Sequence, residues 1–131
     1  MIVLEGLPAL SPFRRERLQA RLQAIDAGIR ITGAWHVYWI AADAGATLDP
    51  AVLHRILQAS DAAEAAAPGA TSRYVSPRLG TLSPWASKAG ELLRGAGVPV
   101  KRVERGTRID IAGWPSDPAA AAAVAGVLHD P

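Results

Sequence analysis

Apolar residues recur along the chain at two spacings, one typical of amphipathic helices and the other of half-buried strands. The segment 84–96 carries one helical stripe, made of Trp85, Ala89, Leu92, Leu93 and Ala96. The segment 12–27 carries a second stripe, made of Leu18, Leu22 and Ile25, which Ile29 extends if the helix continues. By contrast, residues 100–112 alternate toward their end, with Ile109 and Ile111 on one face and charged residues on the other. Those charged residues are Arg108 and Asp110.

Helix starts are marked four times by the same signal, a serine or aspartate followed directly by proline. The four pairs are Ser11-Pro12, Asp49-Pro50, Ser83-Pro84 and Asp117-Pro118. An N-cap serine or aspartate accepts a hydrogen bond from a free backbone amide, and a proline at the next position loses no intrahelical bond. These signals predict helices over residues 12–27, 50–58, 84–96 and 118–129.

The segments between the helices have the composition of strands. The predicted strands cover residues 2–6, 33–41, 73–77 and 100–112. Segment 33–41 is the clearest of them, because it is rich in β-branched and aromatic residues. The stretch 59–72 is rich in alanine, glycine and serine, and we expect it to connect two halves of the chain.

The two halves resemble each other in sequence. Residues 3–13 align with residues 75–85, and the same offset places Val37-Tyr38-Trp39 over Ile109-Asp110-Ile111. The order strand, helix, strand, helix is therefore predicted twice, over about residues 1–60 and 73–131, although the apolar stripes of the first and third helices do not superpose. A duplicated α+β unit with its helices on one face of an antiparallel sheet is the simplest architecture.

Composition narrows the classes of function. The 131 residues suffice for one domain with its own core, and a net charge of +2 is too small to imply a nucleic-acid partner. No apolar run reaches the roughly 18–20 residues that span a bilayer. The chain start lacks the features of a secretory signal, so we expect a cytoplasmic location without membrane contact. Cysteine is absent, which excludes disulfides and a thiolate nucleophile from this chain.

Residues 75–106 carry the most specific motif of the chain, VSPRLGTLSPWASKAGELLRGAGVPVKRVERG. The motif resembles the first domain of the large single-chain phosphoribosylformylglycinamidine synthases, which typically has T-P-R-P-G-T-I-S-P-W-S-S-K-A, a short helix and a strand ending in R-x-E-R-G. The matching residues are Pro77, Arg78, Gly80, Thr81, Ser83, Pro84, Trp85, Ser87, Lys88, Ala89, Arg102, Glu104, Arg105 and Gly106. Leu79 and Ala86 depart from the pattern. The opening GLPALSPFR, residues 6–14, also resembles the start of that family.

The resemblance implies a PurS-like, ferredoxin-like domain that contains no catalytic, cofactor-binding or metal-binding residue of its own. In that family the first domain is similar to a fused pair of small subunits. It would bridge the synthetase and glutaminase domains of the same polypeptide and support ammonia transfer between them. The intact enzymes make formylglycinamidine ribonucleotide from formylglycinamide ribonucleotide, glutamine and ATP in purine biosynthesis, with ATP and Mg²⁺ as cofactors. A glutaminase needs a cysteine nucleophile, so we expect this chain alone to be inactive.

Two groups of residues are candidates for contact with partner domains or ligands. The first is a loop and helix start that could bind an anion, made of Arg78, Thr81, Ser83, Ser87 and Lys88. Amides at a helix start, hydroxyl groups and cations can converge there on a phosphate or carboxylate. The plainer interpretation of this group is an N-cap beside a surface lysine.

The second group is a predicted interdomain surface, made of Tyr38, Trp39, Arg102, Glu104 and Arg105. Alternation along a strand places Tyr38 and Trp39 on opposite faces, so we expect one to face the core and the other a partner domain. An uncovered aromatic face would also make the isolated chain self-associate. The three charged residues are explained equally well as an edge-strand face that discourages aggregation.

Two other classes of function stay open at this point. A free-standing, ferredoxin-like regulatory module would have a saturable pocket for a small ligand. An RNA-binding α+β domain is disfavoured by the nearly balanced charge and by the lack of an aromatic, glycine-containing RNA-binding strand. The three histidines lack metal-ligand spacing, and Trp85 is expected in the core because it begins an apolar stripe.

Overall fold

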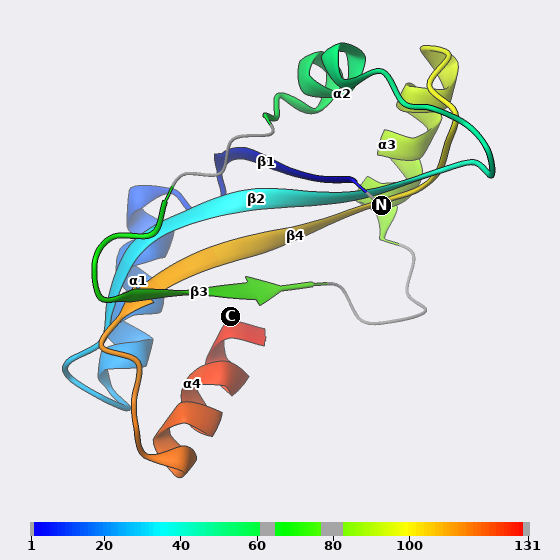
Figure 1. Ribbon diagram of the computed structural model, residues 1–131. Helices are drawn as coiled ribbons and strands as arrows, with labels where there is room; N and C mark the ends of the chain where they lie inside the picture. Colours follow the sequence, from blue (N-terminus) through cyan, green and yellow to red (C-terminus); the bar gives the residue numbers. More distant parts are fainter. Residues whose placement is uncertain (1, 61–64, 77–82, 130–131) are drawn as a thin grey trace. The chain divides into compact units, whose positions relative to one another are not determined.

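The computed structural model describes residues 2–60, 65–76 and 83–129, in which strands and helices alternate (Figure 1). The elements are β1 (Ile2–Pro8), α1 (Pro12–Gln23), β2 (Arg30–Ala42), α2 (Pro50–Leu57), β3 (Ala70–Val75), α3 (Pro84–Gly95), β4 (Val100–Ala112) and α4 (Pro118–His129). The strands form one four-stranded sheet with the order β1-β2-β4-β3. The predicted α+β class, with an antiparallel sheet and a repeated strand-helix order, is confirmed and is consistent with a ferredoxin-like fold.

All four predicted helix starts are confirmed by their hydrogen bonds. In each, a side-chain oxygen of the cap accepts from an amide two or three residues further on: Ser11 from Arg14, Asp49 from Ala51, Ser83 from Ala86 and Asp117 from Ala120. Proline follows each cap and lacks only an amide hydrogen that would have no intrahelical partner. Short-range chemistry therefore determines where every helix begins.

Some predicted boundaries are wrong. Helix α1 ends at Gln23 rather than at residue 27, because the side chain of Asp26 accepts a hydrogen bond from the amide of Gly28 and turns the chain. Strand β3 covers Ala70–Val75 rather than residues 73–77. It begins earlier because it pairs antiparallel with β4, with Ala70 opposite Ala112, and this long-range partner is invisible in the local sequence.

The buried face of α3 also differs from the predicted stripe. Its buried residues are Ala86, Ala89, Gly90 and Leu93, whereas Leu92 is 59% exposed and Ala96 is exposed as well. The buried face of the helix thus consists mainly of small residues, and side-chain hydrophobicity alone does not predict this face. Trp85, predicted in the core, is half-buried and packs against it.

The chain divides into two compact units, each built from both halves of the sequence. Unit 1 contains Met1–Leu7, His36–Ala63 and Ser76–Gly106, and unit 2 contains Pro8–Trp35, Glu64–Val75 and Thr107–Pro131. Unit 1 thus holds β1, α2 and α3, unit 2 holds β3, α4 and α1, and β2 and β4 contribute to both. Exchanging each element with its counterpart in the other half converts the contents of unit 1 into those of unit 2. The superposition of the two halves stays a prediction.

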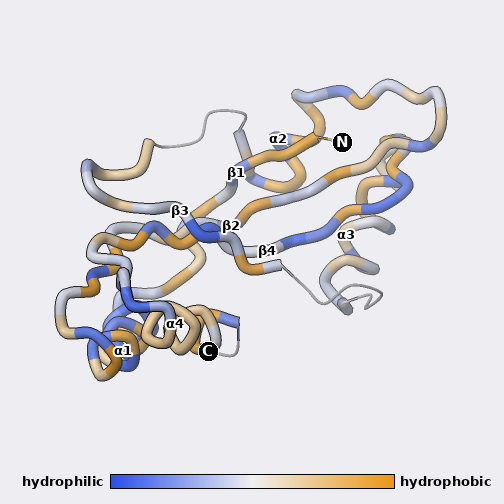
Figure 2. The backbone as a smooth tube through the Cα atoms, turned by 60° about the horizontal axis from the view of Figure 1, so that its bottom comes forward, coloured by the Kyte–Doolittle hydropathy of each residue, from blue (hydrophilic) through white to orange (hydrophobic). Residues whose placement is uncertain are grey.

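Each unit has its own apolar core. The core of unit 1 is formed by Leu4, Tyr38, Ile40, Leu48, Leu53, Leu57, Ala89, Leu93, Val98, Val100 and Val103. The core of unit 2 is formed by Leu18, Leu22, Ile29, Ile31, Ala34, Ile109, Ile111, Val124 and Leu128. Figure 2 shows a long hydrophilic stretch in β4, a strand that nevertheless contributes Val100 and Val103 to one core and Ile109 and Ile111 to the other. Branched aliphatic residues dominate both cores although alanine is abundant in the chain.

Candidate functional site

The predicted anion-binding group is only partly within the described residues. Arg78 and Thr81 lie outside them. Ser83 is the N-cap of α3, where its hydroxyl oxygen accepts from the amide of Ala86 at 3.0 Å, and its carbonyl accepts from the amide of Ser87 at 3.1 Å. The contacts of Ser83 fit the plainer N-cap interpretation. An anion site at this helix start stays a prediction.

Of the two candidate aromatic residues, Tyr38 is the one that faces the core. Its side chain is 6% exposed and stacks on Trp85, with ring centroids 5.6 Å apart and planes inclined by 24°. A Cβ atom on Gly6 would lie 2.6 Å from the Tyr38 ring, so β1 approaches the ring closely only because residue 6 is glycine. Trp39 is half-buried and keeps part of its surface in solvent. Trp39 is therefore the aromatic residue of this pair that is available to a partner.

The environment of Tyr38 changes its acidity. Burial raises the pKa of Tyr38 above its ordinary value of 10.0, and the positive charge of Arg105 lowers that pKa in part. Arg105 itself lies over Trp85, with 4.7 Å from its guanidinium carbon to the ring centroid. Such a contact is an attractive cation–π arrangement. Trp85 thus contacts both a buried phenol and a cation.

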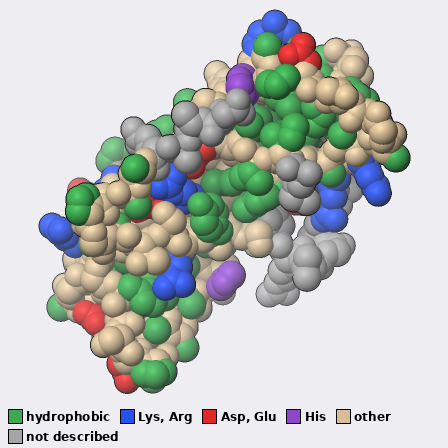
Figure 3. All heavy atoms as spheres, viewed as in Figure 1, with side chains coloured by type: hydrophobic (Ala, Val, Ile, Leu, Met, Phe, Trp, Pro, Cys, Tyr) green, Lys and Arg blue, Asp and Glu red, His purple; other side chains and the backbone are tan. Residues whose placement is uncertain are grey.

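A pocket of about 340 Å³ opens beside these rings in unit 1. It is lined by Leu7, His36, Tyr38, Ile56, Leu57, Gln58, Trp85, Lys88, Ala89, Leu92 and Arg105. The described lining residues include two cations, Lys88 and Arg105, and no aspartate or glutamate. Leu7 and Leu92 belong to this lining although they are 53% and 59% exposed. Hydrophobic side chains gather visibly over this part of the chain in Figure 3.

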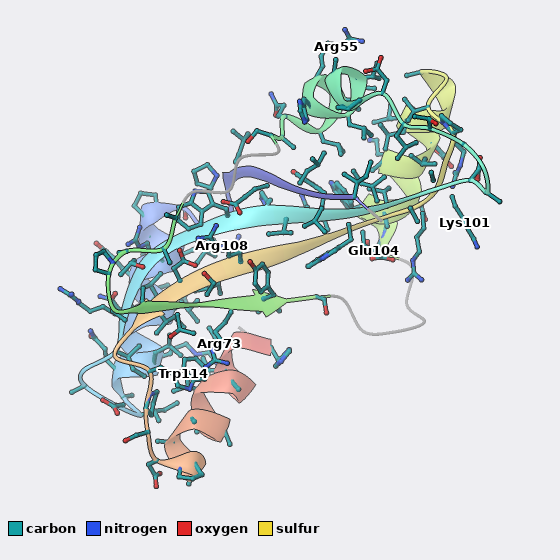
Figure 4. All side chains as sticks on the ribbon, viewed as in Figure 1. Arg55, Arg73, Lys101, Glu104, Arg108 and Trp114 are labelled. Carbon is teal, nitrogen blue, oxygen red and sulfur yellow. The ribbon has the colours of Figure 1, made fainter. Side chains whose placement is uncertain are left out.

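The predicted charged set on β4 is split by the structure. Arg102 and Glu104 form an ion pair, with 2.7 Å between Nη2 and Oε1. The side chain of Arg102 is 53% exposed and that of Glu104 only 14%. Among the described residues, the buried Oε2 atom of Glu104 has no hydrogen-bond partner. Arg105 does not join this pair but contacts Trp85, and Figure 4 shows Glu104 and Lys101 on the same strand.

An ion pair in unit 2 is far more buried than the sequence suggested. Arg108 and Asp110 are 3% and 1% exposed and form two parallel contacts, of 3.0 Å at Nε and 2.9 Å at Nη2. The hydroxyl of Ser72 donates to Asp110 Oδ1 at 2.7 Å, and the Arg108 guanidinium lies over Trp35 at 4.9 Å. Sequence reasoning placed these charges on one strand face but missed their burial. The spacing of two residues was the available signal, because it puts both side chains on one face.

A second pocket, of about 400 Å³, lies in unit 2. Its lining includes Arg73, Tyr74, Trp114 and His129. The guanidinium carbon of Arg73 lies 3.9 Å from the centroid of Trp114, and the two side chains are adjacent in Figure 4. Arg73 thus occupies the face of the largest ring in the pocket.

The residues that the structure describes contain neither a candidate metal site nor a candidate membrane-spanning helix. No group of three or more histidine, aspartate or glutamate side chains there could hold a metal ion. Across the same residues, no helix has both the length and the apolar character that crossing a membrane requires.

Comparison with known protein families identifies the chain. The model of one family, described as the N-terminal region of formylglycinamide ribonucleotide amidotransferase, matches residues 35–131. The match begins within β2, extends through α4 and includes the whole motif of residues 75–106. This amidotransferase is the synthase that the motif resembles, so the resemblance is confirmed. The chain belongs to the family of formylglycinamide ribonucleotide amidotransferase N-terminal domains.

Proposed function

We propose that this chain is a noncatalytic domain that bridges the synthetase and glutaminase regions of a phosphoribosylformylglycinamidine synthase and supports ammonia transfer between them. The family match over residues 35–131 is the observation that carries the proposal. The sequence has no cysteine, so the thiolate that such a glutaminase needs is supplied by another part of the protein. ATP and Mg²⁺ would likewise be bound by the synthetase region.

The bridging role gives specific residues a use. Trp39 keeps a large apolar ring partly in solvent, and large aromatic residues are common at the centres of interfaces. On strand β4, the Arg102–Glu104 pair provides charges of both signs. One carboxylate oxygen of Glu104 has no hydrogen-bond partner among the described residues. We propose that Trp39, Arg102 and Glu104 contact a neighbouring domain, while Tyr38 supports this strand from the core.

The test uses the intact synthase that contains this domain. If the domain aligns the two catalytic regions, Trp39→Lys should let the enzyme hydrolyse glutamine while ammonia escapes. Released glutamate should then exceed the amidine product, whereas the unmodified enzyme forms equal amounts. Phe13→Lys, at a ring that is 66% exposed in unit 2, is the matched control. Equal product amounts in a folded Trp39→Lys enzyme would contradict the contact, and tight coupling in an enzyme that lacks the whole domain would contradict the bridge.

A second candidate function is a regulatory module for a small ligand. The two pockets, of about 340 and 400 Å³, are the observation that favours it. Pockets for small molecules usually have volumes of about 300–1,000 Å³, so both lie in the lower part of that range. A metabolite that changes the rate of the intact synthase, and loses this effect when a pocket residue is replaced, would support the module over the bridge.

A further inference from the structure

The pocket of unit 1 combines exposed apolar side chains with unbalanced positive charge. Leu7 and Leu92 are two of the few large hydrophobic residues that are exposed among the described residues, and both line this pocket. Lys88 and Arg105 line it too, without an acidic residue in the described lining. The pocket therefore offers an apolar surface and a positive potential at the same place.

We propose that this pocket docks a segment of a neighbouring domain of the same protein, in which an acidic side chain stands beside an apolar one. The apolar side chain would pack on Leu7 and Leu92, and the carboxylate would pair with Lys88 and Arg105. This inference rests on the proposed bridging function, because the occupant comes from a domain that the bridge holds. It assigns that contact to one pocket and one kind of sequence.

The exposed leucines favour a protein segment over a small free anion. A hydrophilic anion would satisfy Lys88 and Arg105 but leave Leu7 and Leu92 in water, whereas a peptide side chain covers both kinds of group. Covering apolar surface is the main driving force of most protein association. Excluding water from the pocket would also strengthen the attraction between the cations and a carboxylate, because that attraction grows as the local dielectric constant falls.

Two features suggest that the pocket is prepared for an occupant. The Arg105 guanidinium is already placed over Trp85, so less side-chain freedom is lost when it pairs with a carboxylate. Gln58 ends helix α2 in the left-handed conformation, with φ of 53°, and it also lines the pocket. An amide group there can donate to a carboxylate or accept from the backbone of a docked segment.

Photo-crosslinking in the intact synthase tests the docking directly. Benzoylphenylalanine in place of Leu92 should crosslink to one segment of the synthetase or glutaminase region, and mass spectrometry should find an aspartate or glutamate beside an apolar residue in it. The same group in place of Phe13, which is exposed in unit 2, is the control and should not label that segment. Labelling only within this domain, or of a segment without an acidic residue, would overturn the proposal.

Charge reversal tests the electrostatic part of the same contact. Because Lys88 is exposed, Lys88→Glu should leave the fold intact, as circular dichroism can verify. Loss of one charge pair worth about 1.4 kcal/mol lowers the docking equilibrium constant about tenfold, and the crosslinking yield should fall as the docked fraction falls. Lys88→Arg should keep the yield, and a lysine in place of the partner's acidic residue should restore it in the Lys88→Glu protein. An unchanged yield in Lys88→Glu, or full competition by inorganic phosphate, would instead indicate a different occupant.

The outcome separates this inference from the bridging function. Uncoupled glutamine hydrolysis in Trp39→Lys, together with no crosslink from Leu92 to another domain, would leave the bridge in place and reject this pocket. A crosslink from residue 92 in the intact enzyme, together with full coupling in an enzyme that lacks the whole domain, would keep the docking contact and reject the bridge.

Discussion

Asp110 carries a carboxylate into the interior of unit 2, where it is 1% exposed. Burial of a charge is unfavourable unless the charge is paired and hydrogen-bonded. Arg108 supplies two contacts, and the hydroxyl of Ser72 supplies a third. Asp110 is thus stable in the interior only while these partners are present.

Removal of one partner should therefore destabilise the protein strongly. We expect Asp110→Ala to lower the free energy of unfolding by about 3–5 kcal/mol, because the Arg108 charge stays buried without its carboxylate. The control is Arg102→Ala, which breaks a pair whose arginine is 53% exposed and should lower the free energy of unfolding by less than Asp110→Ala does. Urea unfolding measures both values. Equal decreases in the free energy of unfolding of the two variants would show that the buried pair does not stabilise the protein more than the exposed one.

Tyr38 should make the stability of the chain sensitive to high pH. Its folded-state pKa is raised above 10.0, mainly by burial, so the folded protein favours the neutral phenol. Because the pKa of Tyr38 is higher in the folded than in the unfolded protein, the phenol contributes its full share of stability below the unfolded pKa. That stability is lost as the pH rises above about 10. In Tyr38→Phe the free energy of unfolding should decrease less steeply above that pH, whereas in Tyr74→Phe it should decrease as in the unmodified protein. Urea unfolding at a series of pH values would show this, and a similar decrease in both variants would contradict it.

At the scale of the element, β2 has two faces with different tasks. Tyr38 and Ile40 point into the core of unit 1, whereas Trp39 lies on the opposite face and is half-buried. Val37, on the same face as Trp39 by alternation, is 2% exposed. The core face of the strand is therefore buried, and its other face is buried at Val37 but partly open to solvent at Trp39.

Lysine substitutions on these two faces should have opposite effects. Tyr38→Lys puts an unpaired charge into the core and should lower the free energy of unfolding by several kcal/mol, because a buried charge without a partner is strongly unfavourable. Trp39→Lys should keep the melting temperature and reduce self-association of the isolated chain, because it removes an apolar ring that is partly in solvent. Thermal melts and light scattering measure the two effects. Unfolding of both variants would mean that both faces of β2 are internal.

At the scale of the whole molecule, the chain alone should have no amidotransferase chemistry. Incubation of the purified chain with glutamine and ATP should release no more glutamate or ADP than a buffer blank, because the chain has no cysteine to attack glutamine. Amino-acid analysis and a coupled ADP assay measure the two products. Turnover that persists through repeated purification would contradict the bridging role.

The sequence determined the elements, their order and the family, and it did so through short-range signals. A serine or aspartate before proline specifies a helix start from within one turn, and all four such starts are found. Alternation correctly placed Tyr38 and Trp39 on opposite faces of one strand, and the motif of residues 75–106 identified the family. Each of these features depends on neighbours in the chain, so each can be inferred without a fold.

Only the tertiary structure decided which faces are buried and how the charges are paired. Asp110 is held by Ser72 and contacted through its carbonyl by Thr32, which are 38 and 78 residues away in the sequence. Contacts between distant segments also decide which face of α3 is buried, with Leu92 left in solvent, and they form the pocket between β1, α2 and α3. Local patterns carry no information on such contacts, because the free energy of burying a side chain depends on the surface it packs against. The interior of each unit could therefore be known only once the chain had folded.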